Sequence, residues 1–168
     1  MQIQTQRFGK IEIDESKIIH FVSEILGFPR SRRYVLIPHR PGSPFFWLQS
    51  LEEPDLAFVV TVPRIFFPDY RPQLPPEILK KLRYREGDVL DYLVIVYLPK
   101  DNPEEMTVNL LGPIAVNVDR KLALQVVLDP NRYSVSEPLK PRLRETSPEA
   151  KVFPPLFRES LVQVASCR

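Results

Sequence analysis

The chain of 168 residues contains little glycine, cysteine or histidine. Its five glycines are scattered, so no glycine-rich loop is available to hold phosphates with backbone amides. The single cysteine, Cys167, excludes an intramolecular disulfide and a cysteine-cluster zinc site, and it is typical of a reducing compartment. His20 and His39 have no second histidine or cysteine at metal-ligand spacing. We therefore expect no metal and no cofactor.

Long apolar runs are also missing. The longest, Leu90 to Leu98, is interrupted by Asp91 and is far too short to span a bilayer. The polar start, Met1 to Arg7, does not resemble the basic and then apolar sequence of a signal peptide. We therefore expect a soluble cytoplasmic protein without a membrane partner.

Net charge is small, at +2 from 23 basic and 21 acidic residues. Residues 1–136 hold 17 of each kind, so the main body has no overall field that would attract nucleic acid. We therefore expect no direct nucleic-acid partner. One basic run leaves an alternative open, a small β-barrel that binds single-stranded nucleic acid, because cations around an aromatic ring suit that ligand. The run consists of Lys80, Lys81, Arg83, Tyr84 and Arg85.

Proline, by contrast, is abundant, with 19 residues. It breaks helix interiors but is tolerated at turns and sheet edges, so many short strands are favoured over long helices. We expect an all-β fold, a small antiparallel barrel-like sheet of about eight to ten short strands with two or three short helical turns. Residues 1–136 form this domain, and residues 137–168 form a proline-containing C-terminal tail, docked or mobile.

Several elements can be placed from local patterns. Leu90 to Leu98 is apolar on both faces, which predicts a central strand. Glu77 to Leu82 follows two prolines and predicts a short helix. Glycine predicts a two-residue turn at Gly9-Lys10 and the end of a helical turn over residues 23–27. Further strands are expected at 107–111, 114–118 and 122–128, the last two as a hairpin.

No catalytic motif stands out. The carboxylate clusters Glu52-Glu53-Asp55 and Glu104-Glu105 lie in sequences typical of polar turns. No serine occupies a Gly-x-Ser-x-Gly elbow. We expect a protein that is not an enzyme, and the alternative is an active site of carboxylates gathered from distant strands.

Aromatic residues interrupt the proline-rich segment 63–76, and two interpretations of them are open. Rigid aromatics on preorganised loops make good anchors for a protein partner, because little entropy is lost on docking. Alternatively, they plug one end of a barrel. Under the first interpretation the predicted contact surface contains Phe66, Phe67, Asp69 and Tyr70, with Glu52 and Glu53 as acidic rim groups.

Several strings in the chain, in order and at matching spacing, resemble the flagellar assembly factor FliW family. The two most specific are FFWLQSLEEPDLAF at 45–58 and TVNLLGPIAVN at 107–117. Shorter matches are Phe8-Gly9, Leu26-Gly27-Phe28, Val62-Pro63, Phe67-Pro68-Asp69-Tyr70 and QVVL at 125–128. The resemblance covers about residues 2–135, so the tail after about Glu137 lies beyond it. Glu24 stands in a region where the family usually has a glycine.

The resemblance implies a non-enzymatic, cytoplasmic bacterial protein with a small antiparallel barrel. Proteins of this family bind the translational repressor CsrA and keep it from silencing flagellin mRNA. They also bind flagellin, so free flagellin lowers the population available to CsrA by mass action if the two partners exclude each other. We therefore expect CsrA and flagellin as partners.

Overall fold

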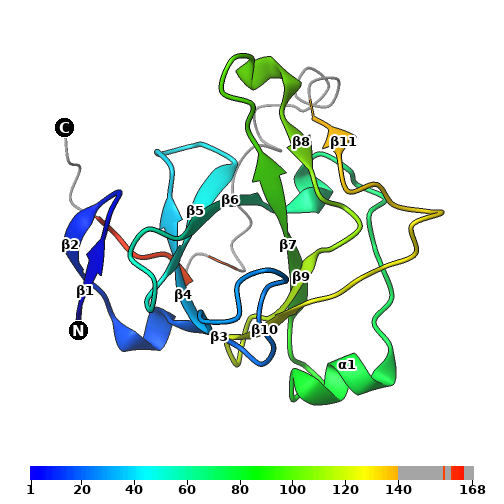
Figure 1. Cartoon of the computed structure of the whole chain (residues 1–168). Coiled ribbons are helices and arrows are strands. Elements are labelled where there is room, and N and C mark those ends of the chain that lie inside the picture. The colour runs from blue at the N-terminus through cyan, green and yellow to red at the C-terminus, as the bar shows by residue number, and fades with distance from the viewer. Residues whose placement is uncertain (140–156, 158–159, 165–168) are drawn as a thin grey trace.

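The computed structural model describes residues 1–139, 157 and 160–164 of the chain. Its centre is a closed barrel in which strands pair in the order β3–β4–β5–β6–β7–β9–β10 and back to β3 (Figure 1). The strands are β3 (Ile19–Phe21), β4 (Arg33–Pro38), β5 (Phe45–Ser50), β6 (Ala57–Thr61), β7 (Leu90–Tyr97), β9 (Ile114–Asn117) and β10 (Leu122–Gln125). The expected all-β, barrel-like fold is confirmed.

One pair in the barrel is parallel, whereas the sequence favoured antiparallel pairing throughout. In β10 and β3, Leu122 lies opposite His20 and Ala123 opposite Phe21, with both strands running the same way. All other neighbours in the barrel are antiparallel. The reason is geometric, because strand direction cannot alternate all the way round a closed ring with an odd number of strands.

Two predicted elements are confirmed. β7, the expected central strand, pairs with β6, β8 (Thr107–Val108) and β9, and Leu93 and Val94 on its two faces are fully buried. The expected helix is α1 (Pro76–Lys81), which begins and ends one residue earlier than predicted. Proline in its first turn forgoes no hydrogen bond, because the amides there have no partner within the helix.

Two elements cover the outside of the barrel. The hairpin of β1 (Gln2–Thr5) and β2 (Gly9–Glu12) packs Ile3 and Ile11 against Val35 and Ile37 of β4. On another side, Ile78 and Leu82 of the α1 segment pack against Ala115 and Leu124 of β9 and β10.

Three local expectations were wrong. The first turn spans residues 6–8 rather than Gly9-Lys10, because the Thr5 hydroxyl accepts from Phe8 N and donates to Gly9 O. No helical turn forms at 23–27, where Phe28 N instead donates to Ile25 O across a tight turn with Gly27 at φ +91°. The strand expected at 107–111 is only β8, because the amides of Leu110 and Leu111 both donate to Ser134 O. The strands expected at 114–118 and 122–128 form the predicted hairpin, but as the shorter β9 and β10.

Short elements complete the described chain. They include the 3₁₀ turns η1 (Glu15–Lys17), η2 (Pro63–Ile65) and η3 (Pro103–Glu105), and the strand β11 (Glu137–Pro138), which pairs with β8. Further along, Leu161 forms a parallel bridge with Leu36, and Lys17 Nζ donates to Leu161 O at 2.7 Å. The division at residue 136 stays a prediction, and Cys167 lies outside the described residues. No helix in the described ranges is long and apolar enough to cross a membrane.

Candidate interaction groove

The predicted aromatic anchors lie mainly in the core. Phe66 is 2% exposed and Tyr70 is 6% exposed, and both belong to the main hydrophobic cluster. The Tyr70 hydroxyl donates to Leu110 O at 2.7 Å, and burial raises its pKa well above the usual value for tyrosine. Phe67 is half-buried against the same cluster, and Asp69 is exposed. Phe66 and Tyr70 therefore belong to the core, and whether Phe67 and Asp69 contact a partner stays a prediction.

The predicted acidic rim groups hold two segments together. Glu52 accepts hydrogen bonds from the amides of Arg32 and Arg33 at 3.2 and 3.1 Å. Glu53 forms an ion pair with Arg30 at 2.9 Å and accepts a hydrogen bond from the Ser31 hydroxyl. These contacts tie the chain ahead of β4 to the turn after β5. Whether the pair also contacts a partner stays a prediction.

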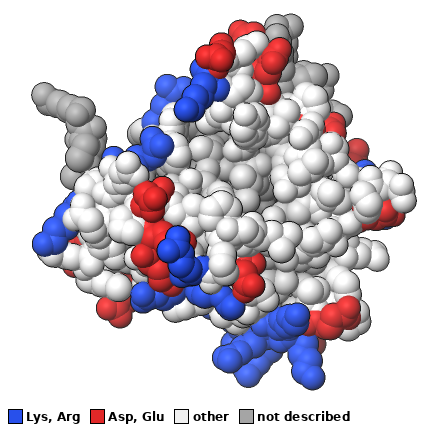
Figure 2. Space-filling model, in the orientation of Figure 1, with Lys and Arg blue, Asp and Glu red and all other residues white. Residues whose placement is uncertain are grey.

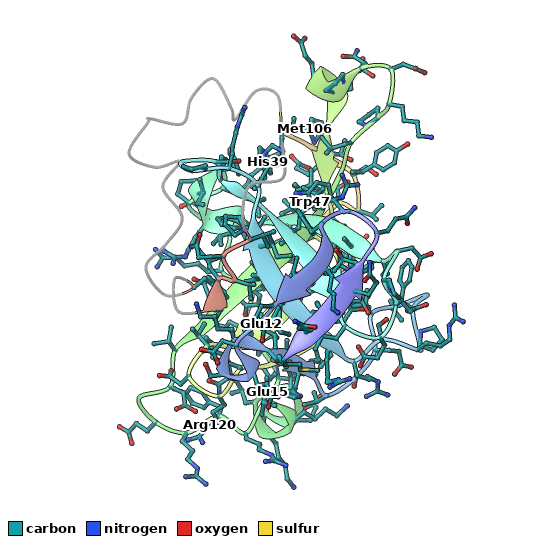
Figure 3. The ribbon with its side chains drawn as sticks, turned by 90° about the vertical axis from the view of Figure 1, so that its left-hand side faces the viewer. Glu12, Glu15, His39, Trp47, Met106 and Arg120 are labelled. Carbon is teal, nitrogen blue, oxygen red and sulfur yellow. The ribbon has the colours of Figure 1, made fainter. Side chains whose placement is uncertain are left out.

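An open groove lies on the outer face of β5 and β6, beyond the part that the β1–β2 hairpin covers. Side chains alternate along β5, so Phe46 and Leu48 fill the barrel core while Phe45 and Trp47 face outward. The groove has a volume of about 610 Å³. Its lining is His39, Arg40, Pro41, Gly42, Ser43, Pro44, Phe45, Trp47, Val59, Leu98, Pro103 and Met106. Figure 3 shows His39, Trp47 and Met106 gathered on one side of the barrel, beside the hairpin.

The floor of the groove is aromatic and held in place. The Arg7 guanidinium carbon lies 3.9 Å from the centre of the Trp47 ring, and the His39 ring lies 6.3 Å from it. At the margin, Leu98 is 43% exposed and its neighbour Tyr97 is 67% exposed. Rigid aromatics beside exposed apolar side chains favour docking of a protein partner. In the described part of the chain, no three histidine, cysteine or carboxylate side chains gather to hold a metal ion.

Comparison with known proteins gives the family. The family model described as "FliW protein" matches residues 2–139. The chain belongs to the FliW family. Among its relatives is the flagellar assembly factor FliW of Natranaerobius thermophilus, 39% identical over 83% of this chain and 92% of that protein. The FliW of Geobacter sulfurreducens is 43% identical over 82% of this chain and 86% of that protein.

A solved structure agrees with this assignment. A crystal structure of the flagellar assembly factor FliW superimposes with a TM-score of 0.74 at 32% identity, covering 83% of this chain and 96% of that one. The resemblance found in the sequence is thus confirmed, and the FliW-family chain shares its fold with that protein. These relatives are named for a role in flagellar assembly rather than for a catalysed reaction.

The first FliW-like segment, residues 45–58, contributes Phe45 and Trp47 to the groove and also fixes the turn after β5. The buried Gln49 amide donates to three carbonyls, those of Ser50, Pro54 and Leu56, at 3.0, 3.3 and 3.1 Å. The Ser50 hydroxyl accepts from the amides of Glu52 and Glu53. The Gln49 Nε2 group and the Ser50 hydroxyl therefore brace this turn, whereas Gln49 Oε1 is buried and has no hydrogen-bond partner among the described residues.

The second FliW-like segment, residues 107–117, is hydrogen-bonded to the QVVL segment through Gln125, the first residue of QVVL. Asn109 Oδ1 accepts from Gly112 N at 2.9 Å, and Gln125 Nε2 donates to Gly112 O at 3.0 Å. Gln125 Oε1 accepts from Leu26 N, so the Leu-Gly-Phe match is connected as well. A Cβ on Gly112 would lie 3.0 Å from Gln125 Nε2, which explains why glycine fits there.

The contact surface predicted from the sequence does not include the groove, although part of the groove carries a signal in the sequence. The period of two along Phe45 to Leu48 indicates that Phe45 and Trp47 face away from Phe46 and Leu48. Met106 and Val59 carried no such signal, because they reach the groove from segments far away in the sequence.

Proposed function

We propose that this chain is a non-enzymatic cytoplasmic regulator that binds CsrA and blocks its action on flagellin mRNA, with flagellin as a competing partner. Membership of the FliW family supports this function. The observation in the structure that carries it is the open groove with Trp47 and Phe45 in its floor. Its shape and lining suit an apolar segment of a protein.

The regulation we propose is mass action on one small protein. If CsrA and flagellin exclude each other, each lowers the fraction of the chain that is free for the other. A difference of about 1.4 kcal/mol in binding free energy changes that competition tenfold. The closed barrel requires no large rearrangement for this, because the groove is preformed.

The experiment combines the purified chain with CsrA and with flagellin, separately and then together, and follows the complexes by size-exclusion chromatography and calorimetry. A labelled flagellin-leader RNA bound to CsrA reports whether the chain releases the RNA. We expect one complex with each partner, and we expect added flagellin to return CsrA to the RNA. If the chain and CsrA elute separately at micromolar concentrations, the proposed function is wrong.

A matched pair of variants tests the groove. Leu98→Asp puts a charge on its margin, where the side chain is already 43% exposed. Val127→Asp introduces the same charge in place of an apolar side chain that is 65% exposed and lies outside the groove. We expect Leu98→Asp to weaken partner binding at least tenfold, which is about 1.4 kcal/mol, while Val127→Asp changes it less than twofold. If both variants lose the same amount of affinity for the partner, the groove is not the binding site.

The surface predicted from the sequence needs a separate test. Asp69 is the exposed member of the predicted aromatic set, so Asp69→Lys changes the surface and spares the core. If Asp69 contacts CsrA or flagellin, affinity falls while the urea midpoint is unchanged. Unchanged affinity for both partners would restrict the interface to other residues.

A further inference from the structure

A compact basic surface surrounds the end of α1, far from the groove in sequence. Ile78 and Leu82 hold this helix against the barrel, so the cations that alternate with them point to solvent. Lys80, Lys81, Arg83 and Arg85 are all exposed, and Tyr84 between the two arginines is 40% exposed. Figure 2 shows the blue group at the lower edge, where α1 lies in Figure 1. We call these five residues the α1 basic surface.

The backbone here adopts a conformation that favours glycine. Arg83 has φ +52°, and the helix ends in a pair of hydrogen bonds, from Arg83 N to Lys80 O and from Tyr84 N to Leu79 O, both at 3.0 Å. A left-handed residue at this place is usually glycine, because a Cβ is disfavoured there. The chain therefore carries a guanidinium where glycine would relieve strain, as it carries Lys121 at the same φ of +52° in the turn between β9 and β10.

Neighbouring residues hold the surface in place. Asp88 accepts from Arg85 N at 2.9 Å and from Asn117 Nδ2 at 3.0 Å, and Asn117 also donates to Leu82 O. Arg120 pairs with Asp88 at 2.9 Å, so its charge is compensated. The four cations of the α1 basic surface, by contrast, form no salt bridge with any residue that the structure describes. Only Glu77 and Glu86 offset them within residues 76–87.

We propose that the α1 basic surface binds single-stranded RNA, with the four cations on successive phosphates and a base stacked on Tyr84. An exposed aromatic ring between cations favours RNA over an acidic peptide, because every base offers a face for stacking and a carboxylate does not. The near-zero charge of residues 1–136 predicted no nucleic-acid partner. Salt screens distant charges, however, so the attraction between the α1 basic surface and a nearby phosphate depends on the local cations and not on the net charge of the chain. This inference goes beyond the proposed function and does not depend on the groove.

The test measures fluorescence anisotropy of a labelled oligouridylate of about 12 nucleotides, titrated with the full chain and no other protein. Three or four phosphate contacts on a single strand predict that affinity falls about 20- to 50-fold between about 50 and 200 mM salt. Arg83→Gly removes one contact and relieves the backbone, so it lowers the slope of log affinity against log salt by about 0.7 without loss of folding. Tyr84→Leu weakens binding at least about fivefold at every salt concentration and leaves the slope unchanged.

A charge-matched control separates this surface from general attraction. Lys80→Gln with Lys81→Gln should lower the slope by about 1.4, whereas Lys10→Gln with Lys100→Gln should leave it unchanged. Lys10 lies in β2 and Lys100 follows β7, both away from α1 in Figure 1. The inference is overturned if the oligouridylate does not bind at low salt, or if both double variants weaken binding alike. It is also overturned if polyglutamate of equal length binds as tightly and responds equally to Arg83→Gly, since the surface then takes an acidic protein segment.

Discussion

The Tyr70 hydroxyl offers the sharpest test of where the proline-rich aromatic segment lies. Tyr70→Phe deletes one oxygen, which in the structure donates to Leu110 O at 2.7 Å in a buried setting. The ring itself keeps its volume and its edge-on contacts with Tyr92 and Tyr133, at centroid distances of 6.1 and 5.4 Å. The variant therefore isolates the hydrogen bond from the packing.

The expected loss follows from the carbonyl that remains. Without the hydroxyl, Leu110 O stays buried but loses this hydrogen-bond donor. The free energy of unfolding should therefore fall by about 1–2 kcal/mol. For a domain of this size, that corresponds to a melting temperature lower by about 2–8 °C. Partner binding should be unchanged, because the oxygen does not reach the surface.

Urea unfolding followed by circular dichroism measures the loss, and calorimetry with CsrA measures binding. Tyr97→Phe is the control, since Tyr97 is 67% exposed and its variant should stay within about 0.5 kcal/mol of the parent. Tyr70→Phe with unchanged stability and weaker CsrA binding would refute the core placement, because the hydroxyl would then be an exposed anchor.

Three further predictions concern buried polar groups. Burial raises the pKa of Tyr34 and of Tyr92 to about 12 in the folded chain. Because the unfolded chain loses these protons at lower pH, the free energy of unfolding should fall as the pH rises above the ordinary tyrosine pKa of 10.0. Urea titrations at a series of alkaline pH values measure this fall. Gly112→Ala should lower the urea midpoint slightly, because the new Cβ would lie 3.0 Å from Gln125 Nε2 and 3.1 Å from Asn109 Nδ2, and the loss should not exceed the net worth of one hydrogen bond, about 1.5 kcal/mol. An unchanged midpoint would show that Gln125 moves freely. Asn117→Ala removes the bonds to Leu82 O and Asp88, so stability falls by about 1–3 kcal/mol and the lowered pKa of Asp88 returns toward 3.8, as carbon-detected NMR titration would show.

Elements with a clear local pattern could be predicted from the sequence. The apolar run of β7 and the prolines ahead of α1 each determine their element within a few residues. Closure of the barrel could not be predicted in this way, because β3 and β10 meet across about a hundred residues and no local pattern marks their pairing. The parallel pair follows from the number of strands in the ring, which the sequence left uncertain.

The candidate site shows the same division. The direction of Phe66 and Tyr70 was open because the prolines around them remove any period of two or 3.6. Glu52 and Glu53 were correctly placed in a turn, but their partners Arg33 and Arg30 lie about twenty residues earlier. The outward direction of Trp47 could be predicted from the alternation of side chains along a strand, whereas the opposite wall of the groove depends on tertiary packing.

Closure through β3 and β10 also sets the order in which the chain can fold on the ribosome. The strands β3 to β7 pair with sequence neighbours as they emerge, but one edge of β3 has no strand until the carbonyls of Lys121 and Ala123 accept from His20 N and Val22 N. During that interval the sheet presents an open edge, to which another copy can pair. Truncation ahead of residue 121 should therefore give an aggregating species rather than a smaller folded domain, because β10 is the strand that covers this edge of β3.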